Sequence, residues 1–260
     1  FRLTNVVPGR YQAQARTGMR GDGELAKMDI VIGNDDVSGV VLVTAPGARA
    51  SGNVVSDTGE ALNFRPQQIQ VAARMADADA QGFGGGPGAN ARVGDDWTFE
   101  LSNLTDARLI RVNTPQEWTL KSVFLEGQEI TDRPMEFPPG QTVTGLQVVL
   151  TKKISVVSGV VTDDRGNPVL DATVVVFPAN ERLWMYQSRF IRAARPDQEG
   201  SYRLTALPPG EDYLMIALQG LEDGQAGDAD FLATIRDQAT GFGLADGETK
   251  AVDVRLTTRP

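Results

Sequence analysis

The 260-residue sequence contains no cysteine and no histidine. Without cysteine the chain forms no disulfide framework, no zinc-thiolate site and no thiol nucleophile. Without histidine it lacks the commonest general base, the commonest zinc ligand and the usual charge switch near neutral pH. The two absences together argue against catalysis, and they leave the redox compartment open.

Positive charge and long apolar runs are also scarce. Lys and Arg number 25 against 34 Asp and Glu, which gives a net charge of −9 and a pI near 4.7. Nucleic-acid binding depends on clustered cations, so we expect no nucleic-acid partner. The longest apolar stretch, Val37 to Val43, is far shorter than the ~18 residues of a membrane-spanning helix, so we expect no membrane insertion.

Short β-branched runs separated by turn residues make up much of the chain. The phrase SGVVTDDRGNPVLDATVVVFP, Ser158–Pro178, predicts a strand, a turn and a second strand. Asp163–Pro168 is a dense cluster of turn-forming residues. We expect the second strand over Val169–Phe177, with alternate side chains facing the core and the solvent.

This phrase is repeated, because SGNVVSDTGEALN begins at Ser51, 107 residues before Ser158. Three closing strands of similar pattern end 107 and 106 residues apart. They lie at Gly33–Thr44, Pro139–Thr151 and Asp246–Thr257. An aromatic-x-Leu phrase precedes each closing strand and starts at Phe1, Phe99 and Tyr202.

The repeat predicts three units along the chain. Residues 1–46 hold the C-terminal part of a first β-sandwich, residues 47–152 a second, and residues 153–260 a third. Recurrent short strands, 28 Gly and 14 Pro indicate all-β sandwiches joined in tandem. The junctions between the units are short, which predicts a fairly stiff rod. One helix is expected over Ala229–Asp237, capped by Asp228 and packed over one end of the third unit.

The sequence resembles the carboxypeptidase regulatory-like domains, also described as transthyretin-like or prealbumin-like modules. The matching phrases are Ser158–Pro178, Gly200–Leu218 and Gly247–Leu256. The resemblance implies seven-stranded Greek-key sandwiches, used in tandem as structural or adhesive modules of exported bacterial proteins. It carries no catalytic residue onto this chain. The middle unit departs from the pattern, since Gly59–Leu62 lacks the usual Pro.

The segment LWMYQSRFIR, Leu183–Arg192, is the main candidate for a binding surface. Trp, Tyr and Arg dominate interaction hot spots, so this segment is expected to contact a glycan or a protein. The residues assigned to that contact are Trp184, Tyr186, Arg189 and Arg192. The alternative interpretation is a strand that adds Leu183, Met185 and Phe190 to the core, with the arginines in solvent.

Two further patterns in the sequence are candidate ligand sites. Asp-Asp pairs at 35–36, 95–96 and 163–164 offer the oxygen ligands that calcium needs, although turn capping explains them as well. Structural calcium is therefore the one cofactor considered. The glycine-rich loop Gly82–Ala89 fits a dinucleotide fingerprint superficially, but it lacks the surrounding βαβ unit, so we predict the tip of a hairpin.

These patterns predict a non-catalytic structural or adhesive module that acts as a spacer, a scaffold or an assembly subunit. We expect an exported protein at the cell surface, outside the cell or in the periplasm, and the start at Phe1 is compatible with an upstream export signal. One alternative is a carbohydrate- or protein-binding module, and another is an appendage of a peptidase or an outer-membrane receptor. Candidate partners are a polysaccharide, a surface protein, or a second copy in an oligomer or filament that completes residues 1–46 by strand addition.

Overall fold

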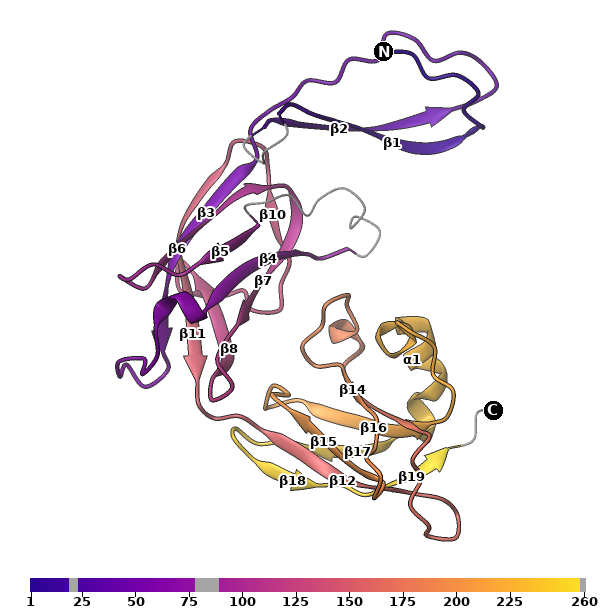
Figure 1. The fold of residues 1–260 in the computed structure, drawn as a ribbon. Helices are drawn as coiled ribbons and strands as arrows, with labels where there is room; N and C mark the ends of the chain where they lie inside the picture. The colour runs from indigo at the N-terminus through magenta and orange to yellow at the C-terminus, as the bar shows by residue number, and fades with distance from the viewer. Residues whose placement is uncertain (19–22, 78–88, 258–260) are drawn as a thin grey trace.

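The computed structural model describes residues 1–18, 23–77 and 89–257. The described part of the chain is all-β with one short α-helix, and its three units follow one another in chain order, which confirms the predicted fold class (Figure 1). Each sheet is built from strands of one of the three units defined above. Within the described part of the chain, no helix has the length and apolarity needed to cross a membrane.

The second unit is a sandwich of two sheets. One sheet has the order β10-β7-β4-β5 and the other β6-β3-β11-β8-β9. Apolar side chains of both sheets, such as Val71, Ile110, Leu101 and Val148, form one buried core between them. The strands are β3 (Ala48–Ser56), β4 (Gln70–Met75), β5 (Asn90–Arg92), β6 (Thr98–Leu104), β7 (Asp106–Asn113), β8 (Thr119–Leu125), β9 (Gln128–Glu129), β10 (Met135–Phe137) and β11 (Thr142–Thr151).

The third unit has two layers of strands, which are joined through one shared strand. Its strands are β12 (Val156–Thr162), β13 (Thr173–Pro178), β14 (Arg192–Ala194), β15 (Ser201–Thr205), β16 (Asp212–Leu218), β17 (Thr240–Gly243), β18 (Thr249–Ala251) and β19 (Val254–Thr257). Strand β19 pairs with both β12 and β16, so it links the layer of β15 to the layer of β13. Val157, Val174, Tyr202 and Met215 lie in the core that these layers enclose.

The helix α1 (Ala229–Ile235) begins as predicted, because the Asp228 carboxylate accepts a hydrogen bond from the Phe231 amide at 2.8 Å. It packs over the outer face of the β13 layer, where Leu232 joins a second buried cluster with Phe177. Strand β13 is therefore buried on both faces. The expectation that its alternate side chains meet solvent is wrong, and the strand begins at Thr173 instead of Val169.

Backbone geometry shows that the sequence repeat is also a structural repeat. The fifth residue of each aromatic-x-Leu phrase has a positive φ, of 60° at Asn5, 55° at Asn103 and 60° at Ala206. The Tyr11 hydroxyl donates to the Val7 carbonyl at 2.7 Å, and the Tyr213 hydroxyl donates to the Pro208 carbonyl at 2.6 Å. In both cases the acceptor is the residue just before a Pro-Gly pair. The first unit can therefore be aligned with the third.

The Ser-Gly pair that opens the repeated phrase has a steric reason. A Cβ atom on Gly52 would lie 2.0 Å from the Leu146 carbonyl oxygen, and one on Gly159 would lie 2.0 Å from the Val252 carbonyl oxygen. In both units the closing strand runs parallel to the opening strand at this point. Glycine is needed there because only a residue without a side chain lets the two backbones approach so closely.

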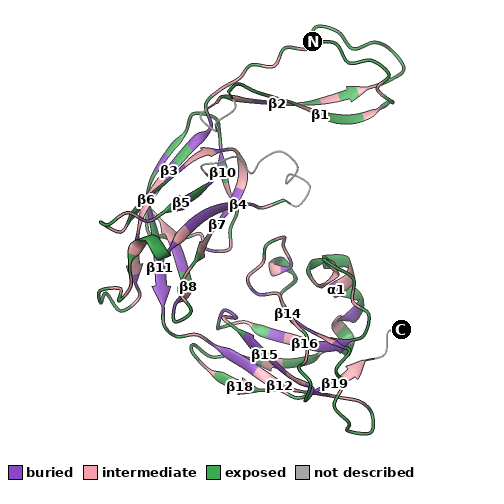
Figure 2. Cartoon of the chain, viewed as in Figure 1, coloured by how far each residue is buried: buried purple, intermediate pink, exposed green. Residues whose placement is uncertain are grey.

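The first unit is an antiparallel pair of strands, β1 (Gly9–Arg16) and β2 (Leu25–Ile32). The closing strand predicted over Gly33–Thr44 does not form, although Ala45 makes an isolated bridge to Leu25. In the other two units the closing strand pairs with an opening strand, and the described residues of the first unit provide no such partner. Figure 2 shows the consequence, because the first unit is almost without buried residues while the other two units have buried strands.

Candidate functional site at the junction of the second and third units

The predicted binding segment is a folded loop between β13 and β14 and not a strand. Asn180 caps a short 3-10 turn, Glu181–Leu183, by accepting a hydrogen bond from the Arg182 amide at 3.3 Å. The Trp184 indole N–H then donates to the Pro178 carbonyl at 2.7 Å. This bond turns the chain back over the end of β13.

The Trp184 ring is a packing residue of the third unit. It is 8% exposed and meets the Phe177 ring edge-on, with 5.7 Å between the ring centroids. The expectation of an exposed Trp184 is therefore wrong, because the loop folds inward. Phe190 is buried in the core, as the alternative interpretation predicted for that side chain. Tyr186 is half-buried, and a binding role for it stays a prediction.

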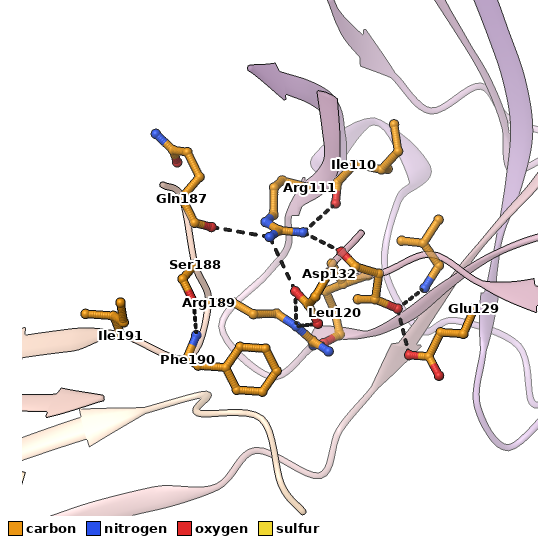
Figure 3. A network of polar contacts seen from close by, with 12 residues as sticks. Ile110, Arg111, Leu120, Glu129, Asp132, Gln187, Ser188, Arg189, Phe190 and Ile191 are labelled. Carbon is orange, nitrogen blue, oxygen red and sulfur yellow. Dashed lines mark hydrogen bonds and ion pairs between the residues drawn. The ribbon is translucent and has the colours of Figure 1, made fainter. Parts of the chain in front are cut away.

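Arg189 reaches from this loop into the second unit. Its Nε donates to both carboxylate oxygens of Asp132, at 3.1 and 2.9 Å. Its Nη1 donates to the carbonyl oxygens of Leu120 and Lys121 on β8, at 3.0 and 3.1 Å. One side chain of the third unit thus holds a loop and a strand of the second (Figure 3).

Arg111 on β7 completes the network from the other side. Its Nη2 donates to Asp132 Oδ1 at 3.3 Å and to the Gln187 carbonyl of the third unit at 3.3 Å. Its Nη1 donates to the Thr131 carbonyl at 2.7 Å, which fixes the loop that carries Asp132 (Figure 3). Asp132 therefore lies between two guanidinium groups that belong to different units. Arg111, Asp132 and Arg189 are called the junction network below.

The junction network is shielded from solvent. The side chains of Arg111, Asp132 and Arg189 are only 15–16% exposed. Burial lowers the pKa of Arg111, the nearby Asp132 carboxylate opposes that shift, and Arg189 adds to it. An exposed ion pair contributes about 0–1 kcal/mol, whereas removal of a buried partner leaves charges uncompensated and costs more. Asp132 is the carboxylate that compensates the positive charges of both Arg111 and Arg189.

Arg192, the remaining predicted site residue, is the first residue of β14 and does not join Asp132. Its Nη1 donates to the Ile191 carbonyl at 3.0 Å. Burial lowers its pKa, the Tyr213 hydroxyl opposes this, and the positive charge of Arg189 lowers it further. The segment identified from the sequence thus contributes one residue, Arg189, to an interface between units. The signal missed in the sequence was Asp132, which belongs to a different unit.

A cleft of about 600 Å³ lies beside the junction network and is lined by both units. Its cations are each paired with a carboxylate, since Lys121 lies 3.0 Å from Asp57 and Lys153 lies 3.0 Å from Asp246. Clefts between domains are common ligand sites.

Two of the acidic pairs each contribute a carboxylate that caps its own turn. Asp163 accepts hydrogen bonds from the amides of Arg165 and Asn167, and Asp96 accepts one from the Thr98 hydroxyl at 2.7 Å. Turn capping is confirmed at these two residues. No group of three or more acidic side chains in the described ranges is placed to hold a metal ion. Of the glycine-rich loop, Gly82–Gly88 lies outside the described residues.

Residues 156–257 match the family model described as the carboxypeptidase regulatory-like domain, which confirms the resemblance over the third unit. None of the curated proteins matches the chain. Among solved structures, a streptococcal ancillary pilin is 13% identical, over 96% of this chain and 76% of that one, with a TM-score of 0.31. A shaft pilin from Lactobacillus rhamnosus GG is 11% identical, over 84% and 98%, with a TM-score of 0.30.

A catechol 1,2-dioxygenase from an Acinetobacter species is 13% identical over 40% of this chain and 52% of that one, with a TM-score of 0.24. Identities and TM-scores this low carry no argument about what the chain does.

Proposed function

Residues 156–257 form a carboxypeptidase regulatory-like domain, and from this premise we propose that the chain is a non-catalytic structural module of an exported protein. Its role is that of a spacer or scaffold in which the second and third units keep one relative orientation. The observation that carries this proposal is the junction network, in which Asp132 of the second unit accepts hydrogen bonds from Arg189 of the third.

A short connection supports the same role. Strand β11 ends at Thr151 and β12 begins at Val156, so few residues separate the two units. Lys153 within this connection pairs with Asp246 at 3.0 Å. Domains linked by long flexible segments move independently, whereas a short connection with polar contacts on both sides limits bending. A spacer needs that restriction, because a freely hinged chain does not hold its ends apart.

The first junction has a similar but more exposed contact. Lys27 on β2 pairs with Asp106 on β7 at 2.7 Å, and these side chains are 39% and 31% exposed. Exposed pairs contribute little, so this junction is weaker than the one built on Asp132. Assembly with a partner through the first unit, and a place at the cell surface, outside the cell or in the periplasm, belong to the same proposal.

The test measures the distance between the second and third units in solution. Because the chain lacks cysteine, one cysteine at Glu60 and one at Glu199, both exposed, can each carry a spin label without background. We expect a single narrow distance distribution for the full chain. Asp132→Ala should broaden it, whereas Asp164→Ala, which removes an exposed carboxylate of the third unit, should not. A broad distribution before any junction residue is changed would rule out the scaffold.

A further inference from the structure

Large apolar side chains exposed on the described surface are concentrated in the first unit. Eight of the nine lie between residues 1 and 43. They are Phe1, Leu3, Val7, Tyr11, Val31, Val37, Val41 and Val43. Scattered exposed apolar residues need no explanation, but a concentration of this kind marks an interaction surface.

The internal repeat identifies what covers the corresponding positions elsewhere. Phe1 is 89% exposed, whereas its counterpart Tyr202 in the third unit is 3% exposed. Val41 is 66% exposed, whereas its counterpart Val254 is 5% exposed. At both positions the two units hold similar side chains, but only in the third unit do other strands bury them. The first unit therefore has the inner face of a sandwich without its second set of strands.

In the third unit the cover is the opening strand pair, β12 and β13. Strand β12 lies between β15, which carries Tyr202, and the closing strands β18 and β19. Strand β13 runs antiparallel to β16, with Pro178 opposite Tyr213. Val157 and Val174 of this pair lie in the core against those strands. In the first unit β1 and β2 are the counterparts of β16 and β17, whereas residues 1–4 and 41–44 align with β15 and β19 without forming strands. The part that the unit needs is therefore a strand pair of this kind.

No strand in the described ranges pairs with the second edge of β1, which is the edge where β13 would lie. The Thr17 amide donates to the Glu24 carbonyl at 2.9 Å, so Thr17 and Glu24 form a hydrogen-bonded pair. This pair fixes which residues of β1 form backbone hydrogen bonds to β2. Because antiparallel neighbours alternate between bonded and non-bonded pairs, the amides of Gln12 and Gln14 point away from β2. An unpaired edge of this type is a template for strand addition.

The charges on β1 distinguish between two possible partners, which are β1 of a second copy and a different strand. Strand β1 contains Arg10 and Arg16 and no carboxylate. Two copies of β1 paired antiparallel about Ala13 would place Arg10 opposite Arg16, and like charges directly opposite destabilise a strand pair. Strand β13, Thr173–Pro178, carries no charged side chain, so a strand of its type can pair with β1 without placing like charges opposite one another.

We propose that the first unit binds an opening strand pair of the carboxypeptidase regulatory-like type. One strand runs antiparallel to β1, with its last residue opposite Tyr11, and the other lies beside residues 37–44. The partner comes from outside residues 1–260, because the opening pairs within them are already built into the second and third units. The inference rests on the proposed structural function and names the strand pair that completes the first unit.

The test adds a peptide with the sequence of residues 155–179 to the full chain. We expect saturable binding, and amide exchange at Gln12 and Gln14, resolved by NMR, should slow at least tenfold. Gln14→Pro should weaken binding at least tenfold, because proline removes an amide directed to the free edge and leaves the β1–β2 ladder intact. A control peptide carrying aspartate in place of Val174 and Val176 should not bind.

A second format covers the case in which the free peptide associates with itself. Residues 153–201 joined ahead of Phe1 present the same strand pair at high effective concentration, and exchange at Gln12 and Gln14 should slow in that fusion as well. Fast exchange in both formats overturns the proposal. Self-association of the unmodified chain that Gln14→Pro abolishes also overturns it, because the occupant is then a second copy.

The two proposals fail separately. The spin-label distance reports on the junction of the second and third units, and the peptide reports on the first unit. A narrow distance distribution without peptide binding removes the strand-docking surface alone. Peptide binding with a broad distribution removes the scaffold alone.

Discussion

Ala206 occupies a backbone conformation that the other two units give to asparagine. Its φ is 60°, and the equivalent residues are Asn5 and Asn103. Asparagine tolerates the left-handed region, whereas for other side chains it costs roughly 1–2 kcal/mol. Three chemically similar phrases thus share one turn, and the third unit has the least suitable residue in it.

Ala206→Asn is therefore expected to stabilise the third unit by about 0.5–1 kcal/mol, by removing part of this backbone strain. The Ala206 amide, which donates to the Ser155 carbonyl at 2.9 Å, keeps its bond in the variant. Urea unfolding followed by circular dichroism measures the change. Asn103→Ala is the reverse control and should destabilise the second unit. A lower stability of Ala206→Asn would contradict the assignment of strain.

Asp163 gives a pH dependence to the turn of the third unit. The Asn167 side chain, the Asn167 amide and the Arg165 amide donate to its carboxylate, and these bonds lower its pKa from the usual 3.8. A carboxylate with a lowered pKa in the folded state stabilises the protein above pH 3.8, and this contribution is lost as the pH falls through the folded-state pKa.

Asp163→Ala should therefore lower the melting temperature of the third unit at pH 7, and the difference from the unaltered chain should shrink as the pH is taken well below 3.8. Scanning calorimetry at several pH values measures it. Asp164→Ala, which changes the neighbouring carboxylate, should show no such convergence. A difference between Asp163→Ala and the unaltered chain that is independent of pH would mean that the carboxylate charge is not involved.

At the scale of elements, patterns confined to one stretch of chain were predicted well. The helix start at Asp228 and the strand-turn-strand phrase after Ser158 both depend on neighbouring residues. Predictions that depended on a distant partner failed. The Gly33–Thr44 segment has the composition of a strand, but it has no opening strand to pair with. Strand β13 looked half-exposed because the sequence does not show that α1 covers its outer face.

The binding loop shows the same limit. Its composition of Trp, Tyr and Arg indicated a contact surface, and Arg189 does make contacts beyond its own unit. The composition did not reveal that Trp184 folds back onto Pro178, or that Asp132 is the residue Arg189 meets. Both facts depend on how the loop closes and how two units meet, and neither follows from local periodicity.

Trp184→Ala should lower the stability of the third unit by about 3–5 kcal/mol, because it empties a packed site beside Phe177. Thermal unfolding measures this loss. Trp184→Phe keeps most of the packing and removes the hydrogen bond to Pro178, so it should cost only about 1 kcal/mol. A stable Trp184→Ala protein that no longer binds a polysaccharide retained by the unaltered chain would restore the glycan-binding hypothesis.

At the scale of the whole molecule, the chain alternates between closed sandwiches and the contacts that join them. Each closed unit satisfies its own core, so the contacts between units determine the shape. The junction network provides such a contact because its central acceptor and one of its donors come from different units. A tandem array keeps its ends apart only where such contacts resist bending between units. The strength of such a contact can be measured as a coupling energy.

Asp132→Ala and Arg189→Ala should be coupled by about 1–3 kcal/mol in a double-mutant cycle, although they lie in different units. Either change alone disrupts the pair that joins the second and third units, so the second change should add little. Calorimetry on the full chain measures the unfolding of both units for the four proteins. Lys121→Ala with Arg189→Ala provides the matched control, because Arg189 contacts only the backbone carbonyl of Lys121, so this pair should be nearly additive. Additive effects of Asp132→Ala and Arg189→Ala would mean that the units unfold independently and that the junction does not stiffen the chain.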